Sequence, residues 1–322
     1  MKTEQTIKIF YNKNQSVSKG ISSSPSRSPE KPKLLLNYLE NRDLLRHFCL
    51  DSDFPRFEKE DFLIAHTEEY VNAFFSGQHP LCSSNGLTWS LELAESTRWT
   101  NSSLYHAIRH SVENPETICF SPTSGFHHAS PGQGSGFCTF SGQVIASVKI
   151  YRELGLKGAW LDLDGHFGNS IEDSRLFVRD LNNAIPPRFN MNPDGKHGEY
   201  IQDLEFCLRM LSAAIERKEL DYLVWAHGAD SHTNDDLGYQ CTTEEWVTCS
   251  KIFYEWVKEI NRHRTKPFPI SLSLFGGYRN DDYNSVLSLH TADLIMCLNT
   301  LCGKNIHYQT EVKSEGPQYV IK

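Results

Sequence analysis

The 322-residue sequence lacks any long hydrophobic run. No apolar stretch reaches the ~18 residues that a membrane-spanning helix needs. The N-terminal stretch MKTEQTIKIFYN has no apolar core of the kind found in signal peptides. These absences argue against a membrane-spanning or secreted protein and favour a cytoplasmic location, or a nuclear one if the organism is a eukaryote.

Paired cysteines and an excess of positive charge are also lacking. The nine cysteines are scattered without a C-x-x-C pair, and many lie in apolar runs such as TICF, EFCL and IMCL. There they act as small hydrophobic residues, so reduced thiols are expected. The net charge of −8 argues against direct nucleic-acid binding, for which a basic face is typical.

Short apolar runs alternate with helical patterns along most of the chain. Strands are predicted at residues 7–11, 117–122, 158–164, 222–228 and 268–277. Helical spacing of apolar residues predicts helices over residues 144–154, 204–215 and 246–260. Buried strands between amphipathic helices indicate an α/β protein whose parallel sheet is covered on both faces.

We expect one domain over residues 1–322. Residues 14–32 form a Ser/Pro-rich loop, which is either a mobile arm or a segment that packs over a site. Residues 303–322 are polar and are expected to be peripheral.

Polar motifs follow the predicted strands. HH, DLDGH, GAD and GGY each lie at or just beyond the carboxyl end of a predicted strand. In open α/β sheets this edge is where ligands bind, so four loops are expected to deliver side chains to one crevice.

The motif DLDGH suggests a metal site. In an extended segment Asp162, Asp164 and His166 point the same way, because side chains alternate along a strand. Unpaired buried carboxylates would cost several kcal/mol each, and a divalent cation bound by Asp164 and His166 would remove that cost. Taken alone, the motif is more typical of a strand that ends in a solvated turn, because short D-x-H matches are frequent.

Asp230 completes a candidate ligand set. Two aspartates and one histidine leave an open coordination position, as in catalytic rather than structural zinc sites. By itself Asp230 is as well explained as a cap or turn residue. The nearby His227 and His232 are interpreted as structural, because three ligands suffice.

Two further motifs indicate a functional site only in combination with these candidate ligands. The adjacent His127 and His128 alone would indicate a polar loop, and Tyr278 alone a packed surface aromatic. The two glycines before Tyr278 let the backbone turn sharply, so that its hydroxyl can project into the crevice.

Four motifs, in order, resemble those of the zinc-dependent histone deacetylases and acetylpolyamine amidohydrolases. They are GFHHASPGQGSGFCTFSGQVIAS at 125–147, LDLDGHFGNS, HGADSHTNDDLG and FGGY. The resemblance runs from roughly residue 25 to 300. It implies the arginase-deacetylase fold, a single three-layer α/β/α domain with a mostly parallel sheet of about eight strands.

The resemblance also implies roles for individual residues. It makes Asp164, His166 and Asp230 ligands of one catalytic Zn²⁺. It makes His127 and His128 the catalytic pair, supported by Asp162 and Asn169 respectively, and Tyr278 the residue that polarises the substrate carbonyl. Gly136 and Phe137 would line an acyl-lysine tunnel, with Phe189 at its rim. Family members also hold structural K⁺ or Na⁺ near the zinc strand through backbone carbonyls.

The sequence departs from the family pattern at four places. Phe167 replaces the second histidine of D-x-H-H, Asp235-Asp236-Leu237 replaces D-P-L, and Asn169 stands where several members have Asp. The segment between the zinc strand and the next strand is short and has little trace of the P-G-T-G loop that shapes the substrate entrance.

The expected function is a zinc-dependent amidohydrolase that removes an acetyl or other acyl group from an amine. Its substrate would be an acyl-lysine protein or peptide, an acetylpolyamine or another acylated small molecule. Two alternatives remain open: a non-catalytic relative that binds acyl-lysine, and a binuclear manganese ureohydrolase on the same fold. Phe167 counts against the second, because a further metal ligand would be expected there.

Overall fold

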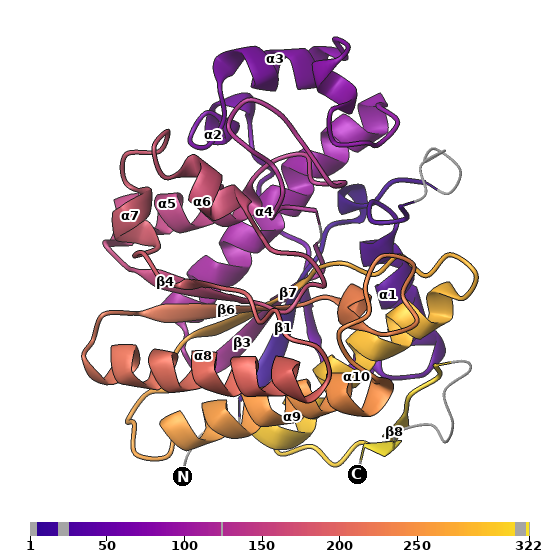
Figure 1. The fold of residues 1–322 in the computed structure, drawn as a ribbon, viewed down its shortest axis with the longest axis vertical. Coiled ribbons are helices and arrows are strands. Elements are labelled where there is room, and N and C mark those ends of the chain that lie inside the picture. The colour runs from indigo at the N-terminus through magenta and orange to yellow at the C-terminus, as the bar shows by residue number, and fades with distance from the viewer. Residues whose placement is uncertain (1–4, 19–25, 124, 313–319, 322) are drawn as a thin grey trace.

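A computed structural model describes residues 5–18, 26–123, 125–312 and 320–321 (Figure 1). Its centre is a seven-stranded sheet in the order β2-β1-β3-β7-β6-β4-β5, and every neighbouring pair is parallel. The strands are β1 Thr6–Phe10, β2 Cys49–Asp51, β3 Thr117–Ser121, β4 Gly158–Asp162, β5 Asn190–Met191, β6 Tyr222–His227 and β7 Ile270–Leu274. The expected single α/β domain is confirmed, with seven strands rather than about eight in the main sheet of the described residues. A separate antiparallel pair joins β8 Tyr308–Gln309 and β9 Val320–Ile321.

All five strands predicted from the sequence are present. The two unpredicted strands of the main sheet, β2 and β5, have only three and two residues, too few to show a pattern. The predicted strands β4, β6 and β7 are buried along their whole length, as expected for parallel strands covered on both faces.

Helices cover both faces of the sheet. They are α1 Lys31–Asn41, α2 Lys59–Phe62, α3 Glu68–Ser76, α4 Leu91–Glu113, α5 Gly142–Leu154, α6 Ser170–Ser174, α7 Leu181–Ala184, α8 Gly198–Glu216, α9 Thr243–Ile260 and α10 Tyr283–Leu301. Short 3₁₀ turns are η1 Lys13–Gln15, η2 Leu45–His47, η3 Leu81–Ser83 and η4 Ala229–Ser231. Figure 1 shows α4 and α5 on one side of the sheet and α8 and α9 on the other.

Tryptophans on neighbouring strands bind the sheet to its two helical layers. Trp160 of β4 donates to the Ser147 hydroxyl of α5 over 3.0 Å. Trp225 of β6 stacks on Phe253 of α9 with ring centroids 4.0 Å apart. Both indoles are fully buried, and burying such a large apolar surface stabilises the three-layer arrangement.

Helix ends are set by local chemistry. At the start of α9, Thr242 and Glu245 form a reciprocal capping box. Gly155 ends α5 at φ 71°, a left-handed conformation that favours glycine, and β4 begins three residues later. The chain thus turns back from α5 to enter the sheet at β4.

The two polar segments are only partly described. Residues 19–25 of the predicted 14–32 loop lie outside the described residues, but Ser26 and Ser28 are buried and α1 begins at Lys31. Residues 313–319 and 322 of the predicted 303–322 segment likewise lie outside them.

The burial of most cysteines agrees with their interpretation as small hydrophobic residues. All nine cysteines are free, and seven of them are buried. In the described parts of the chain, no helix combines the length and apolar character needed to cross a membrane.

His66 joins two loops near the carboxyl edge of the sheet. Its Nε2 accepts from the Ser141 backbone N–H over 2.8 Å, and its Nδ1 lies 3.0 Å from the Ser130 carbonyl. Burial lowers the pKa of His66 to about 4, against the weaker opposing effect of its hydrogen bonds to backbone carbonyls. The imidazole is therefore neutral in the folded protein at pH 7.

His66 should make the stability of the folded protein sensitive to acid. Between pH 6.5 and 4 the unfolded chain binds a proton at His66 that the folded chain does not, so the free energy of unfolding falls as pH falls. The contribution of this one group is about 3 kcal/mol across that window. Urea unfolding at several pH values should show a shallower decline for His66→Gln than for the wild type. Parallel declines would exclude this role.

Candidate active site and metal centre

Three potential metal ligands, Asp164, His166 and Asp230, lie together where two adjacent strands end, and they are called the metal group below. Ligand atoms of Asp164, His166 and Asp230 all lie within 4.8 Å of one another. His166 Nδ1 is 3.1 Å from Asp164 Oδ1 and 3.0 Å from Asp230 Oδ2. Asp164 follows β4 and Asp230 lies in η4 after β6, and β4 pairs with β6. Parallel pairing therefore brings together residues that are far apart in the sequence.

This group fits a divalent cation. Two carboxylates and one imidazole are a donor set that suits zinc, and three protein ligands leave a position open. Asp230 Oδ1 is buried and has no hydrogen-bond partner, which is costly unless a cation satisfies it. The side chain of His166 is 36% exposed whereas both carboxylates are buried, so the histidine is the solvent-exposed member of the group.

Glycines allow the backbone to approach these carboxylates. A Cβ on Gly276 would lie 2.1 Å from the Asp230 carboxyl carbon, and one on Gly228 would lie 2.3 Å from Asp230 Oδ1. The Gly276 N–H donates to Asp164 Oδ2 over 2.7 Å. Only glycine fits at these two positions, which explains the glycines in GAD and GGY.

The buried carboxylates perturb one another. Burial and the neighbouring Asp164 raise the pKa of Asp230 well above its ordinary value. Burial would also raise the pKa of Asp164, but His127 and His166 outweigh it and hold that pKa below its usual range. Hydrogen bonds to both carboxylates raise the pKa of His166 to about 10. Without a metal ion, a proton on the imidazole thus provides the positive charge that the carboxylates require.

The tandem histidines lie beside this group with different partners. The ring centroids of His127 and His128 are 4.1 Å apart. His127 Nδ1 is 3.0 Å from Asp162 Oδ2, and its Nε2 is 3.6 Å from Asp164 Oδ1. His128 Nδ1 is 2.8 Å from Asn169 Oδ1.

The surroundings of the two rings give them different pKa values. Burial opposes the charged form of His127, but Asp164 and Asp162 prevail and raise its pKa to about 9. Burial and the positive charge on His127 lower the pKa of His128 to about 4. At pH 7 the pair therefore consists of one imidazolium and one neutral imidazole.

Asn169 fixes the tautomer of His128. Its Nδ2 donates to Asp173 Oδ2 over 2.6 Å, which turns its Oδ1 towards the histidine. His128 Nδ1 must then carry the proton, and Nε2 keeps a lone pair.

Tyr278, Phe137 and Gly136 surround the same edge. The Tyr278 ring centroid is 5.5 Å from that of Phe137 and 6.5 Å from that of His166. Burial and the nearby carboxylates raise the pKa of Tyr278 above its ordinary value, so its hydroxyl stays protonated. Gly136 has φ 51°, and a Cβ there would lie 2.6 Å from His128 Cδ2.

The prediction for Phe189 is wrong. Its side chain is buried and lines a cavity of about 540 Å³ together with Lys157 and Met210. Lys157 immediately precedes β4, so this cavity lies at the amino end of the strand, opposite the metal group. Phe189 leads directly into β5, and its carbonyl accepts from Trp160, which holds it at that end.

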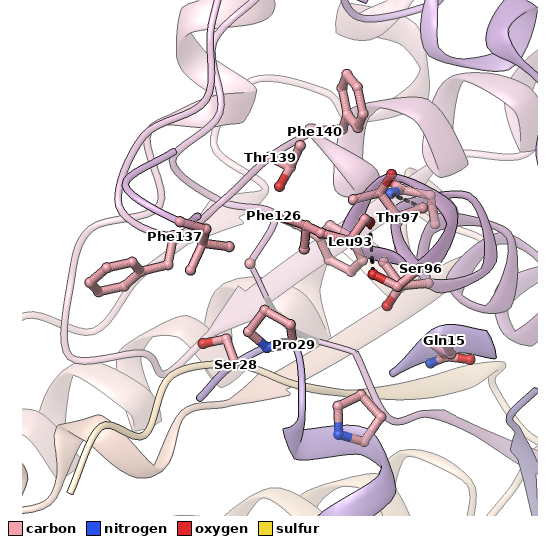
Figure 2. Close-up of a pocket in the computed structure, with 15 residues that line it drawn as sticks. Gln15, Ser28, Pro29, Leu93, Ser96, Thr97, Phe126, Phe137, Thr139 and Phe140 are labelled. Atoms are coloured by element: carbon pink, nitrogen blue, oxygen red, sulfur yellow. Dashed lines mark hydrogen bonds between the residues drawn. The ribbon is translucent and has the colours of Figure 1, made fainter. Parts of the chain in front are cut away.

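A second cavity, of about 40 Å³, adjoins the histidine loop (Figure 2). Figure 2 shows Phe137 on one side of it and Ser96 and Thr97 of α4 on the other, with Ser28 and Pro29 forming part of the wall. The described end of the Ser/Pro-rich segment therefore packs next to the candidate site, which favours the second of its two interpretations.

His227 and His232 have partners away from the metal group. His227 Nδ1 lies 3.2 Å from the Ser250 hydroxyl and 3.4 Å from Asp293 Oδ1. His232 Nε2 lies 2.9 Å from Thr243 Oγ1. These contacts agree with the structural interpretation of both histidines.

Sequence reasoning missed Lys31. This fully buried lysine donates to the carbonyls of Phe275 and Gly276, immediately behind the metal group. Burial lowers the pKa of Lys31 to about 8, although Asp230 and Asp164 oppose the shift. A lysine in the polar stretch SPEKPK carries no pattern that predicts burial.

Comparisons with known proteins agree with this arrangement. The histone deacetylase domain model matches residues 25–180. The solved structure of the HDA15 HD domain shares this fold, with a TM-score of 0.68 at 16% identity, covering 93% of this chain and 89% of that one. The chain is thus similar to histone deacetylase domains over residues 25–180, and it shares their fold.

The similar proteins are distant in sequence. Histone deacetylase 8 of Xenopus laevis is 25% identical over 174 residues, 47% of this chain and 53% of that protein. Histone deacetylase 2 of Arabidopsis thaliana is 24% identical over 174 residues, covering 48% and 42%. An uncharacterized protein of Picosynechococcus sp. is 24% identical over 246 residues, covering 69% of this chain and 77% of its own. The matches thus span only about half of the two named deacetylases.

Zinc bound by the metal group should stabilise the folded protein. Zinc at 100 times its dissociation constant should raise the free energy of unfolding by about 2.7 kcal/mol. Asp230→Asn should weaken zinc binding at least about 100-fold, since it removes a direct ligand. The exposed Asp236 is a matched control, and Asp236→Asn should bind zinc normally. Titration against a chromogenic chelator measures both, and equal affinities for the two variants would contradict the assignment.

Proposed function

We propose that this chain is a zinc-dependent amidohydrolase that removes an acetyl or other acyl group from an amine. The observation that carries the proposal is the convergence of Asp164, His166 and Asp230 beside the tandem histidines. The similarity of residues 25–180 to the histone deacetylase domain supports a deacetylase or amidohydrolase activity. The proposed ligands of the single zinc ion are these two aspartates and His166.

Amide hydrolysis needs an activated water, a polarised carbonyl and a proton for the departing amine. When bound, zinc would supply Lewis acidity and lower the pKa of water at the site. His128 is the proposed general base, because its neutral ring has a lone pair on Nε2 and its Nδ1 is held by Asn169. The proton that it takes up is then available for the amine.

His127 has a different proposed role. Both of its nitrogens face carboxylates, so in the metal-free chain it is an imidazolium and accepts no further proton. A fixed positive charge there favours developing negative charge on the carbonyl oxygen. The role of Asp162 is to keep His127 charged and oriented.

Tyr278 is the proposed hydrogen-bond donor to that oxygen, since its hydroxyl stays protonated and its ring is adjacent to His166. Gly136 and Phe137 are proposed to flank the acylated arm of the substrate. The proposed substrate is an acylated primary amine, carried by a lysine side chain or a polyamine.

A mononuclear site is favoured over the binuclear manganese alternative. Among the described residues, one group of three or more His, Cys, Asp or Glu side chains is spaced to hold a metal ion. The position after His166 is occupied by Phe167, whose side chain offers no ligand and is exposed.

Substituting each histidine should separate the two roles. With an acetyl-lysine peptide as substrate, His128→Ala should lose about 10²–10⁴ in kcat, because it removes the general base. His127→Ala should retain more activity, since it removes a stabilising charge rather than a proton acceptor. A nearly normal His128→Ala beside an inactive His127→Ala would reverse the assignment.

Tyr278→Phe tests the hydroxyl alone. The loss of one oxyanion donor should lower kcat by about 10²–10³ while zinc affinity stays unchanged. Steady-state kinetics together with a chelator titration measure both quantities. Retained turnover would remove Tyr278 from the mechanism.

A further inference from the structure

The backbone of the FGGY turn, Phe275 to Tyr278, connects the parts of the candidate site. The Gly276 N–H donates to Asp164 Oδ2, and the Gly276 carbonyl accepts from the Ala229 N–H over 3.2 Å, next to Asp230. At the other end of the turn, the Tyr278 N–H donates to Asp235 Oδ2 over 2.7 Å. The position of this turn therefore affects both carboxylates and the tyrosine.

Lys31 is anchored on this turn from behind. Its Nζ donates to the Phe275 carbonyl and, over 3.0 Å, to the Gly276 carbonyl. The side chain is fully buried, and Lys31 is the first residue of α1, more than 240 positions away in the sequence. A tertiary contact thus holds two successive carbonyls of a segment that is neither helix nor strand.

The placement of Lys31 is costly unless it serves the turn. A buried ammonium loses its hydration, and a methionine of similar length would fill the same space without that cost. Its described hydrogen bonds are to carbonyl oxygens rather than to a carboxylate, so it restrains the backbone directly. Gly277, with φ 134°, follows at once, and such a flexible residue makes an external restraint valuable.

We propose that Lys31 is a positioning residue for hydrolysis, which fixes the FGGY turn so that Tyr278 and Asp164 are held in working geometry. This inference rests on the proposed function for its kinetic part, whereas its structural part concerns the metal-free chain. Lys31 acts through Tyr278 and the Gly276 N–H and does not touch the substrate.

Amide hydrogen exchange of the metal-free protein tests the structural part. Lys31→Met should accelerate exchange across residues 275–279 at least about tenfold, since the turn loses its anchor. Lys33→Met is the matched control, because Lys33 is exposed on the same helix. It should leave exchange in this segment unchanged. Equal exchange in wild type and Lys31→Met would overturn the proposal.

A double-mutant cycle tests the kinetic part. If Lys31 acts through Tyr278, then Lys31→Met should lower kcat at least about tenfold in the wild type and much less in Tyr278→Phe. Fully additive losses would contradict this. If Lys31 had only a structural role, Lys31→Met would lower the free energy of unfolding, but its effect on kcat would not depend on Tyr278.

Two outcomes keep the proposals distinguishable. If the wild type hydrolyses no acyl amide, the proposed function fails while the exchange experiment still decides the anchoring role. If the wild type is active and Lys31→Met exchanges normally, only the role of Lys31 fails.

Should Lys31→Met not fold, Lys31→Gln retains a donor on a shorter side chain. Its exchange across 275–279 should then be faster than in the wild type, and unchanged exchange would overturn the proposal.

Discussion

The structure depends on one electrostatic constraint: three carboxylates are buried at a single edge of the sheet. Asp162, Asp164 and Asp230 are each almost completely inaccessible, yet they lie on the ends of the adjacent strands β4 and β6 or just beyond them. Such charges are tolerated only with compensating positive charge nearby. The surrounding residues, namely His127, His166 and Lys31, supply it in the metal-free chain, and the proposed zinc ion would supply more.

The same constraint explains the composition of the loops. The backbone passes so close to the Asp230 carboxylate that a Cβ would not fit, so glycine is required at 228 and 276. It also divides the tandem histidines, because the ring beside Asp162 is charged whereas the ring beside the neutral Asn169 is not. Asp164 and Asp162 outweigh burial at His127, whereas burial and the charge on His127 prevail at His128, so the two rings have opposite proton affinities.

Much of the fold was predictable because its signals are local. Residues such as Val224 and Trp225 belong to an apolar run long enough to identify a buried strand, and in parallel sheets the carboxyl ends of such strands share one edge. The expected meeting of Asp164, His166 and Asp230 followed from that geometry, and the structure brings these three side chains together. Strand β5 was not predicted, because two residues carry no periodicity.

What could not be predicted depends on tertiary contacts. Phe189 was assigned to the entrance, but pairing of β5 with β4 places it at the opposite end of the strand. Lys31 lies in a polar stretch, and its burial results from the packing of α1 against α10 and the FGGY turn. Neither position is encoded in the residues around it.

The most direct test of this account is a crystal structure of the protein grown with zinc, with anomalous scattering recorded at the zinc absorption edge. We predict one strong peak within bonding distance of Asp164, His166 and Asp230, with an open side facing His127 and His128. A zinc peak elsewhere, or none at these three residues, would contradict the account.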